Sequence, residues 1–152
     1  QVVKFLLESG SDVNERDNDG MTPLIHACWK GHLQVVKFLL ESGSSVNEKN
    51  NGGWNSIMWA CINNNLNMMK LLMEGGEVRI NEKNENGQSS FFFGLEDAEK
   101  EGNLMERVDL FLKHGFHLTD TNGEGETVFD IVKDPESLRN HLSRRKKKKP
   151  TQ

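Results

Sequence analysis

Apolar residues occur along this chain in short clusters at helical spacing, separated by turn-forming residues. Residues 24–28 and 35–40 are mostly apolar, and Gly31 lies between the two clusters. This spacing predicts two short helices, over about 24–30 and 33–42. Neither helix can bury its apolar face alone, so the pattern predicts that stability comes from the stacking of neighbouring units.

The residues that flank these helices are of the types that start and stop helices. Thr22 can cap the first helix through its hydroxyl, and Pro23 is tolerated in the first turn. Gly43 can take the left-handed conformation that ends the second helix. Upstream, Asn18-Asp19-Gly20 is a turn sequence in which the glycine can adopt a positive φ. Each unit is therefore expected to be a turn followed by two helices.

The unit recurs every 33 residues. Residues 1–16 and 34–49 are identical at fourteen of sixteen positions, which indicates a duplication, and this period is typical of stacked helical repeats. The first unit starts at its second helix, so we expect an incomplete N-terminal repeat. Because Gln1 is not an initiator methionine, the chain is interpreted as a fragment of a longer protein with more repeats upstream.

The later units keep the spacing with substitutions. In the third unit Asn64 replaces the glycine between the helices. In the fourth, the phenylalanines of 91–93 occupy the expected first helix, and residues 95–101 lengthen the unit before a second helix over 105–113. In the last unit Thr127 is the expected cap of a short helix, and a final, more polar helix is expected to run from Asp134-Pro135 through Leu142.

The second unit, residues 17–49, resembles an ankyrin repeat. The residues that carry the resemblance are 17–27 (DNDGMTPLIHA), 31–40 (GHLQVVKFLL), Gly43 and Val46-Asn47. One departure is Ile25, which stands where the family's Thr-Pro-Leu-His motif has its histidine, so that His26 takes the next position. The resemblance extends over residues 1 to about 142 and implies an all-α, ankyrin-type solenoid of helix-turn-helix units with hairpin-like turns.

The expected organisation is one repeat domain over 1–142 followed by a basic, disordered tail over 143–152. The repeat units lie at about 1–16, 17–49, 50–83, 84–121 and 122–142. The net charge is −4, with 19 basic and 23 acidic residues. The tail supplies six of the basic residues, so the body is acidic, which argues against a nucleic-acid-binding face there.

The basic run has three interpretations. It consists of Arg144, Arg145, Lys146, Lys147, Lys148 and Lys149. It is a solvated terminus, a nuclear import signal, or an attachment to anionic lipid or nucleic acid that weakens with salt.

No residue pattern in the chain predicts catalysis, a metal or a cofactor. There is no Walker-type glycine loop and no Gly-x-Ser-x-Gly elbow. The histidines do not form a ligand cluster, and Cys28 and Cys61, 33 residues apart, are expected to be equivalent core positions that stay reduced. No apolar run approaches the roughly 20 residues that span a bilayer. We expect no enzyme activity, no small-molecule substrate, no cofactor and no membrane span.

The resemblance implies that turn tips and first helices line a concave face that binds a partner protein. Trp29 and Trp54 are candidate contact residues, because interface tryptophans often dominate binding energy. Alternatively, they fold back onto neighbouring turns. Trp59 and most of 91–93 are expected in the core, and the acidic residues of 96–101 form a solvated helix face or an acidic docking element. The predicted partner-binding residues are Asn18, Asp19, Met21, Trp29, Lys30, Asn51, Trp54, Ile62, Asn63, Glu85, Asn86 and Gln88.

The sequence therefore favours a protein-interaction module that binds an unidentified partner protein. We expect it to be a monomer in the cytoplasm or nucleus. The alternative is a regulatory or targeting region of an enzyme whose catalytic domain lies outside this chain.

Overall fold

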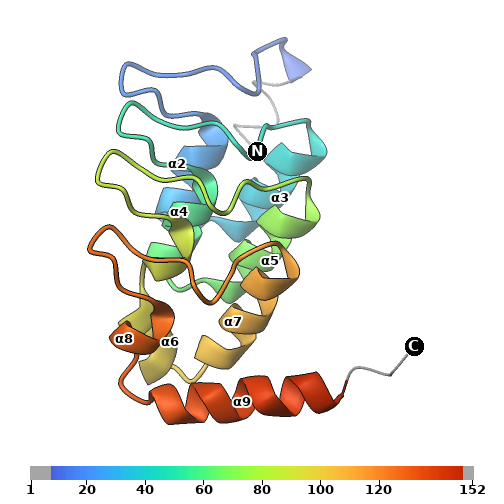
Figure 1. Cartoon of the computed structure of the whole chain (residues 1–152). Helices are drawn as coiled ribbons and strands as arrows, with labels where there is room; N and C mark the ends of the chain where they lie inside the picture. Colours follow the sequence, from blue (N-terminus) through green and yellow to red (C-terminus); the bar gives the residue numbers. More distant parts are fainter. Residues whose placement is uncertain (1–7, 149–152) are drawn as a thin grey trace.

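The computed structural model describes residues 8–148 and shows pairs of helices stacked in two layers (Figure 1). One layer contains α2 (Pro23–Lys30), α4 (Ser56–Ile62), the 3-10 turn η1 (Ser90–Phe92), α6 (Leu95–Lys100) and α8 (Val128–Ile131). The other contains α3 (Leu33–Glu41), α5 (Leu66–Glu74) and α7 (Leu104–Lys113), and α9 (Pro135–Lys147) lies across the end of the stack. The predicted all-α stack is confirmed: between residues 8 and 148 the only β-type pairings are two isolated bridges.

The core runs continuously between the two layers and repeats with the sequence. Cys28 of α2 and Cys61 of α4 are both fully buried with free thiols, as predicted from their spacing. The facing second helices repeat in the same way, since Val36 and Leu39 of α3 correspond to Met69 and Leu72 of α5, and all four are buried. Each unit therefore covers the apolar face of the next.

One polar side chain at the start of each turn holds the turn in shape. Its Oδ1 atom accepts hydrogen bonds from the backbone N–H groups two and four residues further along, at 2.9–3.1 Å. Four turns share this arrangement, and the acceptors are Asp17, Asn50, Asn84 and Asn122. The four turn tips consequently have the same shape.

Tips of equal shape stack directly on one another. The N–H of Asn51 donates to the carbonyl of Asp19 in the preceding turn at 2.9 Å, and that of Glu85 donates to Gly52 at 3.1 Å. The approach is close enough to require glycine, because a Cβ atom on Gly20 would lie 2.5 Å from Oδ1 of Asn51. Gly20 also has a φ of 75°, which disfavours other residues.

Asparagines join the units on the opposite side as well. Asn14 accepts from the N–H of Ser45 at 2.9 Å, and Asn47 accepts from that of Arg79 at the same distance. The amide of Asn81 donates to the carbonyl of Gly115 at 3.2 Å. The second, third and fourth units are thus joined to one another at both ends of their helical pairs.

Removing one turn acceptor should destabilise the fold measurably. Asn50→Ala leaves the N–H groups of Gly52 and Trp54 without their acceptor, so we expect a loss of about 1–2 kcal/mol in the free energy of unfolding. Urea unfolding followed by circular dichroism measures this. Asn50→Asp is the matched control, because an aspartate, Asp17, is the acceptor in the preceding unit. Its free energy of unfolding should stay within about 0.5 kcal/mol of the wild type. Equal losses in both variants would contradict the role assigned to the oxygen.

The fourth unit departs from the expected helix pair. The sequence places a first helix across 90–93, but only the 3-10 turn η1 forms there, and the residues that lengthen the unit form α6, in line with the helix face expected over 96–101. The chain bends at Gly94, which has a φ of 65°, and a Cβ atom there would overlap the carbonyl oxygen of Cys61. Contact with α4 therefore displaces the helix to the other side of Gly94.

Arg107 of α7 occupies the space beside this shortened helix. Its side chain is fully buried, and Nη2 donates to the carbonyls of Phe91 at 2.6 Å, Ser90 at 3.4 Å and Phe93. The guanidinium carbon lies 5.7 Å from the ring centre of Phe91, where the ring face attracts a cation. Burial lowers the pKa of Arg107. The guanidinium thus holds together carbonyls that a regular helix would pair internally.

Loss of Arg107 should be among the most damaging changes in the chain. Arg107→Ala leaves three carbonyls without this donor and opens a cavity, so we expect a loss of roughly 3–5 kcal/mol of stability. Urea unfolding gives the value, and the exposed Lys113→Ala on the same helix should change it by less than about 0.5 kcal/mol. Similar values for both variants would show that the buried guanidinium is dispensable.

Helix α9 is longer than the sequence indicates. We expect an end at Leu142 and disorder from residue 143, whereas the helix continues to Lys147. Arginine and lysine are good helix formers and cations are favoured near a helix C-terminus, which explains the extension. Lys149 and the first helix expected within residues 1–7 lie outside the described residues.

Asp109 of α7 fixes the extended part of α9. Its Oδ1 lies 2.9 Å from Nε2 of His141 and 3.2 Å from Nη1 of Arg145. Nearer its start, α9 buries Leu138 completely. These contacts hold much of the basic run, whose described members are Arg144, Arg145, Lys146, Lys147 and Lys148, at a defined place on the stack.

Candidate functional site

Four aromatic rings from three consecutive units form a row on the first-helix layer, which we call the aromatic strip: Trp29, Trp59, Trp54 and Phe93. The ring centres of Trp29 and Trp59 are 6.0 Å apart and inclined by 45°. Trp59 and Trp54 stack at 4.9 Å, and Trp54 and Phe93 at 4.8 Å. The strip places residues that are 64 positions apart in the sequence on one continuous surface feature.

The strip is partly open to solvent. Trp29 is 43% exposed and is the one exposed large hydrophobic side chain among residues 8–148. The other three rings are half-buried. The ammonium of Lys30 lies 4.0 Å from the centre of the Trp29 ring, a cation–π contact that adds positive charge to this end of the strip.

The structure corrects the expectation that Trp59 lies in the core. Trp59 is half-buried and lies between the rings of Trp29 and Trp54. The sequence contains the reason: Trp59 aligns with His26 of the preceding unit, three residues before Trp29, and residues three apart share a helix face. His26 and Trp29 indeed lie 6.0 Å apart. Of the phenylalanine triplet, Phe91 is buried, while the other two rings are half-buried.

Most of the predicted partner-binding residues have accessible side chains. Met21 is the exception that we correct: it is only 7% exposed, and its sulfur lies 3.4 Å from the amide nitrogen of Asn50 in the stacked turn. The others divide into an exposed and a half-buried group. Exposed are Asn18, Asp19, Trp29, Lys30, Asn51, Asn63, Glu85 and Asn86, and half-buried are Trp54, Ile62 and Gln88.

Two of these residues also connect units. The amide of Asn63 donates to the carbonyls of Cys28 and Trp29, both at 3.2 Å, and so ties the end of α4 to α2. The amide of Asn51 donates to the carbonyl of Asn18 at 3.0 Å. Substitutions at either position would therefore disturb stacking as well as the surface.

Carboxylates accompany the strip at the turn tips and on α6. The hydrogen bond with His26, followed by that from the N–H of Met21, lowers the pKa of Asp17 below its ordinary value, so this carboxylate stays charged near neutral pH. Glu96 and Asp97 of α6 are exposed, and so is Glu101 at its C-terminal cap, which accepts from the amide of Asn64 at 2.8 Å. The acidic residues considered from the sequence thus remain accessible, except that Glu99 is half-buried.

The described residues offer little for catalysis or metal binding. No group of three or more His, Cys, Asp or Glu residues in 8–148 could hold a metal ion. Burial raises the pKa of Cys28 to about 12 and that of Cys61 to about 11, so neither thiol forms a nucleophilic thiolate near neutral pH. Within the same span, no helix has the length and apolar composition needed to cross a bilayer.

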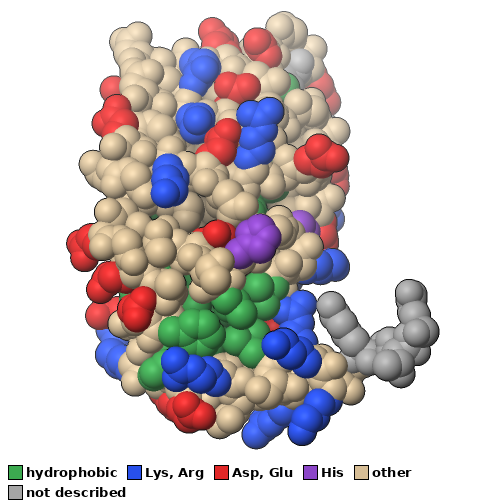
Figure 2. All heavy atoms as spheres, in the orientation of Figure 1, with side chains coloured by type: hydrophobic (Ala, Val, Ile, Leu, Met, Phe, Trp, Pro, Cys, Tyr) green, Lys and Arg blue, Asp and Glu red, His purple; other side chains and the backbone are tan. Residues whose placement is uncertain are grey.

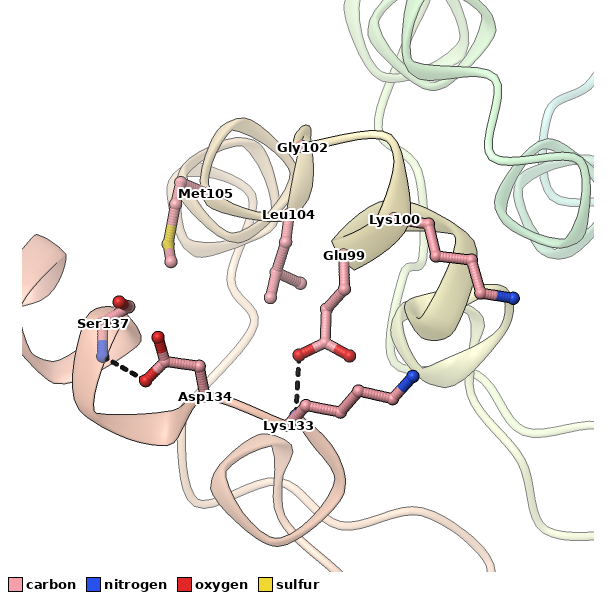
Figure 3. A pocket seen from close by; sticks show the side chains of 8 residues that line it. All are labelled: Glu99, Lys100, Gly102, Leu104, Met105, Lys133, Asp134 and Ser137. Atoms are coloured by element: carbon pink, nitrogen blue, oxygen red, sulfur yellow. Dashed lines mark hydrogen bonds between the residues drawn. The ribbon is translucent and has the colours of Figure 1, made fainter.

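A hollow between α6, α7 and the start of α9 has both of its carboxylates hydrogen-bonded to backbone N–H groups (Figure 3). Leu104 and Met105 line it from α7. The carboxylate of Glu99 accepts the N–H of Lys133 at 2.7 Å, and that of Asp134 accepts the N–H of Ser137 at 3.0 Å. The Glu99 contact therefore joins α6 to the residue that precedes the α9 cap, and Asp134 caps the N-terminus of α9. Both contacts are structural.

The stacked helical pairs and their aligned turn tips define a helical repeat protein. A family model described as ankyrin repeats in three copies matches residues 1–84, which is more than half of the chain. The chain belongs to the ankyrin repeat family, and ankyrin repeats are generally protein–protein interaction modules and typically non-catalytic. No curated protein sequence matches the chain at a significant level. The matched region ends where the fourth unit begins to depart from the helix pair.

The aromatic strip contains all three tryptophans of a chain without tyrosine, which makes it observable by spectroscopy. Stacked indoles couple electronically, so we expect an exciton couplet in the circular dichroism of the native protein. Trp54→Phe and Trp29→Phe should each reduce it, because each removes one of the two indole pairs, at 4.9 and 6.0 Å. Trp59→Phe should abolish it, because Trp59 belongs to both pairs. A couplet that survives in Trp59→Phe would contradict this order of the rings.

Proposed function

We propose that this chain is a protein-interaction module that binds a partner protein through its turn tips and first helices, with the aromatic strip at the centre of the contact. The observation that carries the proposal is the strip itself. Its rings span three units, and Trp29 leaves much of its surface in water. Exposed tryptophan next to further aromatic surface is typical of binding hot spots.

The arrangement of the rings favours tight binding at low entropic cost. Trp54 is held between two neighbouring rings at 4.9 and 4.8 Å, and Trp59 also packs against the core. A partner would meet rings whose rotamers are already restricted, so less conformational freedom is lost on association. Asp19 and Glu85, exposed at the turn tips, add charge selectivity at the border of the contact.

Several expectations accompany this proposal. They are the division into five units, a monomeric state, a location in the cytoplasm or nucleus, and an import role for the basic run of residues 144–149. The proposal does not depend on any of them, because the aromatic strip lies within residues 29–93.

Truncation of Trp29 is the sharpest test of the proposed surface. The chain is used as bait for affinity purification, and the captured partner is titrated against variants by isothermal calorimetry. Trp29→Ala should weaken binding by about 2 kcal/mol, roughly thirtyfold, because it removes an exposed ring at the centre of the contact. The circular dichroism of the helices should not change, because Trp29 is the ring least embedded in the fold.

Leu71→Ala is the matched control for this test. It truncates a half-buried apolar side chain on α5, in the other helical layer. Partner binding should be unchanged by this substitution. If Trp29→Ala binds as the wild type does, or if Leu71→Ala causes the larger loss, the proposed surface is wrong.

A further inference from the structure

A second apolar surface lies at the far end of the stack, away from the aromatic strip. It is a groove of about 560 Å³ between the end of α7, the loop that follows and α9. Figure 2 shows hydrophobic side chains gathered in this region, with Lys and Arg side chains along its border. Its apolar residues are Leu112, Leu118, Phe129 and Leu142, all half-buried, and its basic residues are Arg139, Arg145 and Lys146.

The groove exists because the last unit is too small to cover its neighbour. Helix α8 has four residues, and only Val128 of them is fully buried. Helix α9 buries Leu138 alone. The apolar side of α7 near Leu112 therefore remains partly uncovered, and Phe129 of α8 lines the opening.

The border of the groove carries a charge opposite to that of the chain as a whole. Residues 137–148 contain six Lys or Arg residues and no Asp or Glu, in a chain of net charge −4. Arg139 pairs with Glu136 and lies 5.0 Å from the ring centre of Phe129, and Arg145 pairs with Asp109. For Lys146, no ion pair is formed with any residue of the described span. Basic side chains thus border the apolar floor directly, and Lys146 is the one of the three without a carboxylate partner among residues 8–148.

We propose that this groove docks an acidic peptide segment of a partner protein, with large apolar side chains in the groove and carboxylates at Lys146 and Arg139. This is a binding surface in addition to the aromatic strip. An apolar floor with a basic border matches a segment in which Leu or Phe alternates with Glu or Asp. The interaction should weaken as the salt concentration rises, because the border charges are exposed.

The geometry favours a peptide over the other occupants of such a surface. A bilayer surface is flat and takes up apolar side chains that project, whereas these four are half-buried within a groove. A second copy of the chain would have to offer an exposed apolar side chain, and within 8–148 the large one is Trp29, which lies beside Lys30. Lys30 would meet the basic border with like charge.

The test starts from random peptides displayed on phage, which presuppose no partner. The full chain is immobilised, and phage that bind the bare support are removed beforehand. Selected peptides should be acidic and contain at least two large apolar residues. Peptides that are basic or uncharged, or a selection without enrichment, would overturn the proposal.

Labelled peptides from this selection are then titrated by fluorescence anisotropy. Leu142→Asp should weaken binding more than about tenfold, because it places a carboxylate on the apolar floor. Asn140→Asp, which adds the same charge on α9 away from the groove, is the matched control. Lys146→Glu should weaken binding about fivefold, and Lys147→Glu, an exposed neighbour outside the groove, by less than about twofold. Equal effects within either pair would contradict the assigned contacts.

Three further measurements separate this surface from its alternatives. Peptide binding that is lost in Trp29→Ala but kept in Leu142→Asp would place the site on the aromatic strip and overturn the groove proposal. The groove proposal would also be overturned by Leu142-dependent sedimentation with phosphatidylserine–phosphatidylcholine vesicles. Leu142-dependent dimerisation in the ultracentrifuge would overturn it too. If instead the groove variants behave as expected while Trp29→Ala leaves partner capture intact, the groove stands and the function proposed for the strip fails.

Discussion

The architecture depends on a single hydrogen-bonded feature that recurs in every turn, the side-chain oxygen that accepts two backbone N–H groups. Asp17 and Asn50 show the same contacts one period apart. Because the tips then have equal shapes, the backbone of one can donate to the backbone of the next, and Gly20 allows the close approach. This spacing sets the distance between first helices, and that distance brings Trp29 and Trp59 within stacking range.

Much of the fold was predictable because its determinants are local and periodic. Thr22 and Pro23 start α2 as expected, with the Thr22 hydroxyl accepting the N–H of Ile25. Asn64, which replaces a glycine, is the one residue other than glycine with a positive φ among those described. The positive φ of Asn64 is predictable from the alignment of units, because Asn64 stands where another unit has glycine. Asparagine tolerates this conformation better than most residues.

The parts that could not be predicted depend on contacts between distant residues. Arg107 lies in an amphipathic helix, and nothing in its sequence neighbourhood indicates that its guanidinium is buried against the carbonyls of 90–93. The groove is not predictable from the sequence for a similar reason. Leu112, Phe129 and Leu142 come from three helices, and each looks like a core residue by itself. Only their spatial arrangement shows that the last unit leaves them partly open.

The stacking of Phe93 on Trp54 has a thermodynamic consequence for the array as a whole. Repeat proteins fold through coupling between nearest neighbours, and the weakest junction sets the size of the cooperative unit. The fourth unit joins the third through a 3-10 turn rather than a full helix, and this aromatic pair crosses the junction. A ligand that covers both rings adds its binding free energy to the junction by linkage. Occupancy of the strip would then strengthen the coupling between the third and fourth units.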